Sequence, residues 1–169
     1  DLAMRRKLLG EEHLDMTDSL NDLAMTLTRR GDYAEAEPLY YKALAVRRKL
    51  LGDEHPSVAQ SLNNLAMFLY RKGDYAEAEP LFREALAMNR KLLGDEHPEE
   101  STNLNNLALA LRDKGDYAEA EPLFRQVLVM DRKLLGTNHP YVAGTIVNLA
   151  MLLRRRGDYA EAESLYRKA

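Results

Sequence analysis

The chain has 169 residues with nearly balanced charge, since 24 Lys and Arg residues stand against 27 Asp and Glu residues. This balance argues against non-specific nucleic-acid binding, which needs a dominant basic surface. No apolar run approaches the roughly 18 residues of a membrane span, and no secretory signal pattern is present. Cysteine is absent, which excludes disulfides and thiolate metal sites. The absence of cysteine is compatible with the cytoplasm, where we expect the protein, and equally with a secreted protein without disulfides.

The sequence repeats itself with a period of 42 residues. The segment Gly-Asp-Tyr-Ala-Glu-Ala-Glu occurs four times without a change, starting at Gly31, Gly73, Gly115 and Gly157. A second segment, Arg-Lys-Leu-Leu-Gly, ends at Gly10, Gly52, Gly94 and Gly136, again 42 residues apart. A fixed period of this length indicates a solenoid, in which one small unit stacks on copies of itself.

Each repeat contains two predicted helices, which we call helix A and helix B. In the second repeat, residues 56–72 carry apolar residues at steps of three and four, which predicts an amphipathic helix A. Pro56 suits its first turn, and Gly73 ends it in the left-handed conformation. Asp74 is the expected N-cap of helix B, with Glu77 at the third position of a capping box. Helix B then runs for about 19 residues to the Leu-Leu before Gly94.

A proline lies inside three of the four B helices, at Pro38, Pro80 and Pro122. An interior proline removes a helical hydrogen bond and tends to kink the helix. Two interpretations remain open: a bend that helps helix B follow the stack, or a proline close enough to the helix start to cost little. The fourth repeat has Ser164 at this position, so a bend is not obligatory.

The repeat resembles the tetratricopeptide repeat, and its 42-residue length and loop motifs resemble the repeats of kinesin light chain. The packing positions of that motif are occupied in the second repeat by Leu62, Leu65, Ala66, Leu69, Gly73, Tyr75, Ala78, Phe82 and Ala85. The kinesin light chain likeness rests on Leu-Asn-Asn-Leu-Ala, Ala-Glu-Ala-Glu-Pro-Leu and Leu-Leu-Gly-Asp-Glu-His-Pro. The resemblance covers essentially the whole chain. It implies an all-α, right-handed superhelical solenoid that binds protein segments and has no catalytic activity.

The repeat boundaries divide one tetratricopeptide domain, 1–169, into four repeats that follow a partial helix. Residues 1–10 correspond to the second half of a helix B, and the repeats span 11–52, 53–94, 95–136 and 137–169, the last with a shortened helix B. Neither end has the polar character of a capping repeat. One interpretation is a fragment of a longer array. The other is head-to-tail self-association through the two incomplete helices, which gives open filaments.

In the tetratricopeptide fold, helix A lines the concave groove, so the resemblance places ligand-binding residues on the A helices. The candidates in repeats two to four are Gln60, Asn63, Asn64, Met67, Tyr70, Arg71, Thr102, Asn105, Asn106, Leu109, Arg112, Asp113, Gly144, Val147, Asn148, Met151, Arg154 and Arg155. Repeat one supplies Asp18, Asn21, Asp22, Met25, Thr28 and Arg29.

Asn64, Asn106 and Asn148 recur once per repeat and are the strongest candidates. An asparagine side chain has one acceptor and two donors, so it can hold the backbone of an extended peptide without reading its sequence. The kinesin light chain resemblance implies this role. The nearby arginines can pair with a carboxylate, which favours an acidic peptide or protein partner. In the alternative interpretation, each asparagine bonds within the helix stack and binds no ligand.

The repeated histidines and glutamates have simpler explanations than a metal or catalytic site. One histidine occurs at the same loop position in every repeat, so no two are local neighbours: His13, His55, His97 and His139. We therefore expect them to pack at helix starts rather than bind zinc. The glutamates lie at helix B starts, where the helix dipole favours them. No phosphate-binding loop or catalytic triad pattern is present, so we expect no cofactor and no enzymatic activity.

Overall fold

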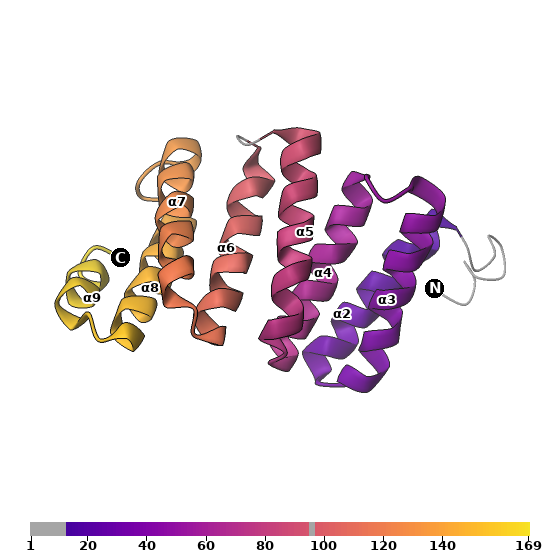
Figure 1. The fold of residues 1–169 in the computed structure, drawn as a ribbon, viewed down its shortest axis with the longest axis horizontal. Helices are drawn as coiled ribbons and strands as arrows, with labels where there is room; N and C mark the ends of the chain where they lie inside the picture. The colour runs from indigo at the N-terminus through magenta and orange to yellow at the C-terminus, as the bar shows by residue number, and fades with distance from the viewer. Residues whose placement is uncertain (1–12, 95–96) are drawn as a thin grey trace. The chain divides into compact units, whose positions relative to one another are not determined.

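The computed structural model describes residues 13–94 and 97–169, and every regular element in these ranges is an α-helix (Figure 1). The helices are α2 (Leu14–Arg30), α3 (Tyr33–Leu51), α4 (Pro56–Lys72), α5 (Tyr75–Leu93), α6 (Pro98–Lys114), α7 (Tyr117–Leu135), α8 (Pro140–Arg156) and α9 (Tyr159–Tyr166). The predicted all-α fold is confirmed, and α2, α4, α6 and α8 are the A helices. None of these described helices is long and apolar enough to span a membrane. The incomplete helix expected over 1–10 lies outside the described residues.

The chain divides into two compact units, Asp1–Leu92 and Leu93–Ala169, which we call the first and second units. In the first unit, α3 packs against both α2 and α4, and the two A helices also meet each other. In the second unit, α7 packs in the same way against α6 and α8, and α9 packs on α8. Each unit therefore holds two neighbouring A helices supported by the B helix that connects them.

The ends of helix A follow the sequence pattern. The bounds predicted for the second repeat are those of α4, and Gly73 ends this helix with φ 96° and ψ 2°. In that left-handed conformation, its N–H donates to the carbonyl oxygens of Leu69 and Tyr70. At the other end, His55 Nδ1 accepts a hydrogen bond from the Ser57 N–H at 3.1 Å. The other three loop histidines cap their A helices in the same way, so the prediction that they serve helix starts is confirmed.

The start of helix B differs from the predicted capping box. The carboxylates of Asp32, Asp116 and Asp158 make no cap hydrogen bond. Each pairs instead with the basic residue two positions earlier, as Asp32 does with Arg30 at 2.6 Å. The main-chain carbonyl of Asp32 accepts hydrogen bonds from the N–H groups of Glu35 and Ala36. Its carboxylate is therefore available to pair with a cation. The predicted lengths are correct, and the B helices continue through Pro38, Pro80 and Pro122.

Within each unit, part of the core lies where the connecting B helix meets the following A helix. In the first unit, the rings of Tyr33 and Tyr40 pack on Phe68, with centroid distances of 6.0 and 5.2 Å. Ala36 is completely buried beside them, because its small side chain lets the helices approach closely. This packing holds α3 against α4.

Candidate functional site

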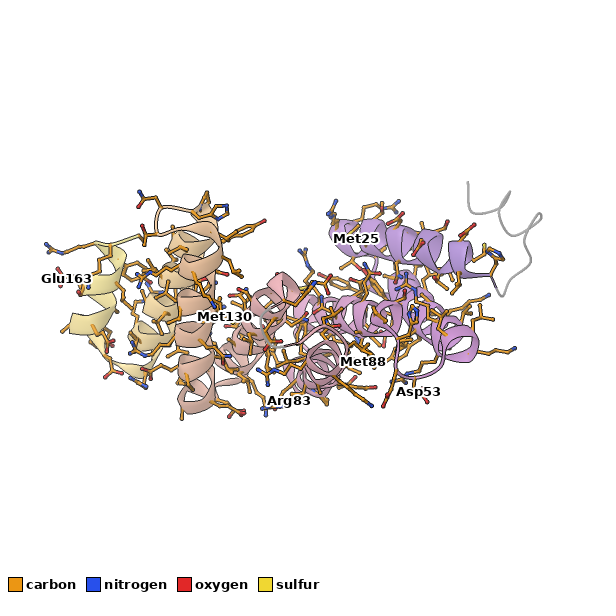
Figure 2. All side chains as sticks on the ribbon, turned by 90° about the horizontal axis from the view of Figure 1, so that it is seen from above. Met25, Asp53, Arg83, Met88, Met130 and Glu163 are labelled. Carbon is orange, nitrogen blue, oxygen red and sulfur yellow. The ribbon has the colours of Figure 1, made fainter. Side chains whose placement is uncertain are left out.

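The first unit has a groove between its two A helices, which we call the first groove. Its volume is about 310 Å³. Its lining comes from α2, α3 and α4: Asn21, Asp22, Met25, Thr28, Arg29, Tyr40, Gln60, Asn64, Met67, Phe68 and Arg71. Met25 is labelled on α2 in Figure 2. The predicted residues Asn21, Gln60, Asn64, Met67 and Arg71 therefore come together in one groove.

An asparagine in this groove lacks hydrogen-bond partners. Asn21 is only 8% exposed, and neither its Nδ2 nor its Oδ1 is hydrogen-bonded within the described residues. A buried polar group without a partner costs about 1–3 kcal/mol. Asn64, half-buried on α4, contributes a second amide to the same groove. The two side chains offer both donors and acceptors to a bound peptide backbone.

Two arginines give the first groove a basic end. Arg29 and Arg71 occupy the last turns of α2 and α4, and both are exposed. Neither forms an ion pair with a described residue; the guanidinium of Arg29 lies 3.7 Å from Met25 Sδ. Asp22 lines the same groove and is its acidic residue. The groove thus carries two cations and one anion.

The second unit also has a groove between its A helices, of about 610 Å³, which we call the second groove. It is lined by Ser101, Thr102, Asn105, Val127, Asp131, Leu134, Leu135, Pro140, Tyr141, Gly144, Thr145 and Asn148. Its lining shares three repeat positions with that of the first groove, those of Asn21, Gln60 and Asn64, so the two linings overlap only in part. Asn105 and Asn148 are two of the predicted residues.

Two neighbouring positions of each A helix can carry asparagine, as Asn63 and Asn64 do in α4. In both grooves, the earlier A helix contributes the first of these positions and the later A helix contributes the second. Each groove therefore contains a pair of asparagines, Asn21 with Asn64 and Asn105 with Asn148, whereas the strongest candidates from the sequence were Asn64, Asn106 and Asn148.

The predicted residues Arg112 and Arg155 are engaged inside the second unit. The Arg112 side chain is buried, and its Nη2 and Nε lie 2.9 and 3.0 Å from the carboxylate oxygens of Asp113. Arg112 Nη1 also donates to Asn148 Oδ1 at 3.3 Å. Arg155 Nη1 reaches Asp113 Oδ1 at 2.6 Å. Arg112 thus differs from the expected exposed, ligand-facing arginine, and Asn148 makes the internal bond of the alternative interpretation.

The remaining predicted residues line neither groove. Asn63 is half-buried and Asn106 is buried, and both have interaction partners. The ring of Tyr70 packs on Tyr75, with centroids 5.5 Å apart. Met151 is half-buried and Arg154 is exposed. These positions contribute to packing or surface rather than to the first or second groove.

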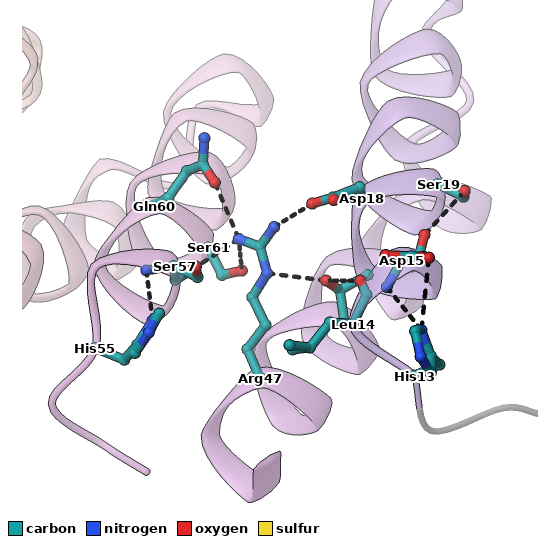
Figure 3. Close-up of polar contacts among 11 residues, drawn as sticks. His13, Leu14, Asp15, Asp18, Ser19, Arg47, His55, Ser57, Gln60 and Ser61 are labelled. Atoms are coloured by element: carbon teal, nitrogen blue, oxygen red, sulfur yellow. Dashed lines mark hydrogen bonds and ion pairs between the residues drawn. The ribbon is translucent and has the colours of Figure 1, made fainter. Parts of the chain in front are cut away.

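A buried polar residue near the end of helix B, Arg47, was not predicted from the sequence. Arg47 Nε donates to Thr17 Oγ1 at 2.9 Å, and its Nη2 pairs with Asp18 at 2.5 Å (Figure 3). Its Nη1 donates to the Ser57 carbonyl at 2.7 Å and to Ser61 Oγ at 2.9 Å, and lies 3.2 Å from Gln60 Oε1. Arg47 therefore joins α2 to α4.

The second unit has Asp131 at the position of Arg47, two periods later. Asp131 Oδ1 accepts a hydrogen bond from Ser101 Oγ on α6, and Thr145 Oγ1 on α8 lies 3.4 Å from Oδ2. The signal in the sequence was the change from Arg to Asp at one repeat position, although the period alone does not reveal that this position is buried. Within the described ranges, no cluster of three potential metal ligands occurs.

The chain is similar to known tetratricopeptide repeat proteins. The sequence model of the tetratricopeptide repeat matches residues 15–91, 57–133 and 100–169. A solved structure from Podosopora anserina, described as a putative kinesin light chain with nearly identical TPR-like repeats, is 30% identical, with a TM-score of 0.82. The alignment covers 99% of this chain and 79% of that one. A single-substitution variant of the same protein is also 30% identical, with a TM-score of 0.84 and the same coverage.

A further solved structure, BtubC (BKLC) from P. vanneervenii, is 26% identical with a TM-score of 0.84. That alignment covers 98% of this chain and 66% of the other. No curated protein matches the chain. The family match extends over more than half of the sequence, and the solved neighbours are repeat proteins of the kinesin light chain kind. The chain therefore belongs to the tetratricopeptide repeat family.

Proposed function

We propose that this chain is a non-catalytic interaction scaffold that holds an extended, acidic peptide segment in the first groove. Tetratricopeptide repeats are in general protein-interaction scaffolds. The observation that carries the proposal is the Asn21 amide, which is buried at the groove with both its polar atoms unpartnered among the described residues. A peptide bond supplies one donor and one acceptor, which is the complement that this amide lacks.

Other residues of the groove suit the same ligand. Met25 and Met67 face it from the two A helices, and methionine adapts its shape to varied apolar side chains. Arg29 and Arg71 supply guanidinium groups that a carboxylate of the peptide would satisfy through charge-assisted bonds. Asp22 carries the opposite charge and disfavours a second carboxylate beside it. We therefore infer a peptide with its acidic residue at the arginine end.

The test is to select peptides from a random phage-displayed library and measure their affinity by fluorescence anisotropy. We expect the selected peptides to carry net negative charge. We expect the Asn21→Ala/Asn64→Ala double variant to bind them about tenfold more weakly or worse, since two amide contacts are lost. Asn63→Ala is the matched control, because Asn63 lies beside Asn64 but does not line the groove. Equal affinity of the double variant, or selection of neutral or basic peptides, would contradict the proposal.

A second candidate function is head-to-tail assembly of copies of this chain. Two exposed apolar surfaces favour it. Leu23 on α2 is 38% exposed, whereas Leu65 at the same position of α4 is fully buried. Tyr159 on α9 is 69% exposed, whereas Tyr33 at the same position of α3 packs on Phe68. The α2 helix of a second copy would cover α9 as α4 covers α3.

Multi-angle light scattering from micromolar to millimolar concentration tests this assembly. We expect the mass to rise above the 19.3 kDa monomer as concentration increases. A Tyr159→Lys/Leu23→Lys variant should remain monomeric, because each substitution places a charge in the apolar contact. A constant monomer mass for the natural sequence would rule the assembly out and would leave peptide binding unaffected.

A further inference from the structure

The second groove contains a buried carboxylate that no cation of the described residues balances. Asp131 is 6% exposed, lines the groove and accepts a hydrogen bond from the Ser101 hydroxyl. Thr145 Oγ1 lies 3.4 Å from Asp131 Oδ2, while its hydroxyl donates to the Tyr141 carbonyl at 3.0 Å. No described residue forms an ion pair with it. A carboxylate offers about four acceptor positions, so the hydrogen bond from Ser101 leaves capacity for further donors. A buried charge is normally paired, because removal from water is costly.

The first unit shows what occupies the same space when a cation is present. There the Arg47 side chain fills the region between the A helices, and its guanidinium meets Thr17, Asp18, Gln60 and Ser61, together with a backbone carbonyl (Figure 3). Two periods later these four side-chain positions carry Ser101, Thr102, Gly144 and Thr145, all of which line the second groove. The second unit thus keeps hydroxyl acceptors but replaces the arginine by a shorter acidic residue. The second groove therefore extends into the region that Arg47 fills in the first unit.

We propose that the second groove is a socket for an arginine side chain presented by a partner protein. The partner's guanidinium would occupy the place that Arg47 occupies within the first unit. This inference goes beyond the proposed function, because it concerns the other unit and a ligand of opposite charge.

The lining of the second groove suits each part of an arginine side chain. Asp131 provides the charge, and the buried Oδ1 of Asn105, which lacks a partner among the described residues, provides a further acceptor. Tyr141 is 70% exposed, and its ring can stack on a guanidinium. Leu134 and Leu135 offer apolar surface to the methylene groups. Asp131 and Tyr141 are the ionisable residues of the lining, so no cation competes for the carboxylate there.

The test uses two small probes that differ in charge but hardly in shape, N-acetyl-arginine methylamide and its citrulline analogue. Each is titrated into the isotopically labelled full chain and followed by NMR chemical shifts. We expect the arginine probe to shift the amides of α6, α7 and α8 around the groove, and the citrulline probe to bind at least about tenfold more weakly. Equal binding of the two probes, or no binding of the arginine probe, would overturn the proposal.

Two variants locate the charge that attracts the probe. Asp131→Asn should weaken arginine binding about tenfold or more, while Asp158→Asn, a control carboxylate outside the groove, should leave it unchanged. Asp131→Arg should abolish binding with the fold retained, because it supplies in the chain the side chain that the first unit already contains. Undiminished binding by either Asp131 variant would overturn the proposal. The shifts also separate this site from peptide binding in the first groove, which would move amides of α2 and α4.

Discussion

The two units share their helices but differ in the charges between their A helices. In the first unit, Arg47 bridges the A helices, and Arg29 and Arg71 form no ion pair with a described residue at the groove end. In the second unit, Asp131 replaces the bridging arginine, and Asp113 replaces the counterpart of Arg29 and pairs with Arg155. The same backbone plan therefore gives one groove with an open basic end and another with an acidic base.

The comparison distinguishes residues that recur in every repeat from residues that change between repeats. Residues that recur in every period, such as the Gly-Asp-Tyr-Ala segment, form caps and helix contacts and make the units alike. Several residues that depart from the period, such as Arg47 and Asp131, lie between the A helices, where the proposed ligands would bind. We expect the binding specificity of the array to depend on residues that differ between the units. The substitutions below exchange or remove such residues.

The largest effect is expected from removing the bridge of the first unit by Arg47→Ala. The substitution deletes five hydrogen bonds of a buried guanidinium and leaves a cavity between α2 and α4, so we expect a loss of about 3 kcal/mol. Native-state amide exchange in these two helices measures the loss locally, because two units need not unfold together.

Arg48→Ala is the matched control for this bridge. Arg48 follows Arg47 in α3 but is partly exposed and pairs with Glu84 at 2.5 Å. A surface pair of this kind contributes about 1 kcal/mol or less. If both substitutions cost the same, Arg47 does not hold the A helices together and the contrast between the units loses its structural basis.

Most of the fold was predictable from the sequence, because it depends on local rules that the period repeats. The bounds of helix A follow from Pro56 and Gly73, and the histidines at its start behave as expected. The capping box predicted on the second repeat does not form at the matching Asp32, because that carboxylate forms an ion pair with Arg30. The motif takes no account of a nearby cation.

The site was only partly predictable, because it depends on the rotation of each A helix. Asn63 and Asn64 are adjacent, but only Asn64 lines the first groove, and a turn of about 100° per residue separates their directions. The repeat pattern also did not predict that Arg112 pairs with Asp113. Both residues are polar on an amphipathic helix and would ordinarily be placed in solvent.

A smaller effect on stability, with a clear effect on binding, is expected from Arg29→Asp. This substitution copies Asp113 of the second unit into the first and should form a pair with Arg71 like that of Asp113 with Arg155. An exposed pair adds at most about 1 kcal/mol to the free energy of unfolding. Acidic peptides selected on the natural chain should bind about tenfold more weakly, because both guanidiniums are neutralised or removed.

Arg30→Asp makes the same change in net charge outside the groove, since Arg30 pairs with Asp32. Peptide affinity, measured by fluorescence anisotropy, should stay close to that of the natural chain in this control. A parallel loss in both variants would mean that overall charge, rather than the arginine end of the groove, attracts the peptides.

The smallest effect concerns an ion-pair network that differs between the units at two positions, where Arg125 and Arg156 replace Tyr41 and Lys72. Glu121 accepts hydrogen bonds from Arg156 and, at 2.7 Å, from Arg125, while the corresponding Glu37 pairs with Lys72 at 3.1 Å and has Tyr41 in place of Arg125. Burial alone would raise the pKa of Glu121, but the two guanidiniums outweigh it and hold that pKa below its ordinary value of 4.5.

Because the pKa of Glu121 is lowered by folding, its contribution to stability is present above pH 4.5 and is lost as the pH falls through the lower, folded-state pKa. Glu121→Gln should therefore reduce the free energy of unfolding by up to about 1 kcal/mol at neutral pH, and the difference from the natural chain should vanish in acid. Glu37→Gln should cost less, since only one cation is lost. Urea unfolding of both variants across this pH range measures the difference, and equal costs would show that Arg125 adds nothing to the second unit.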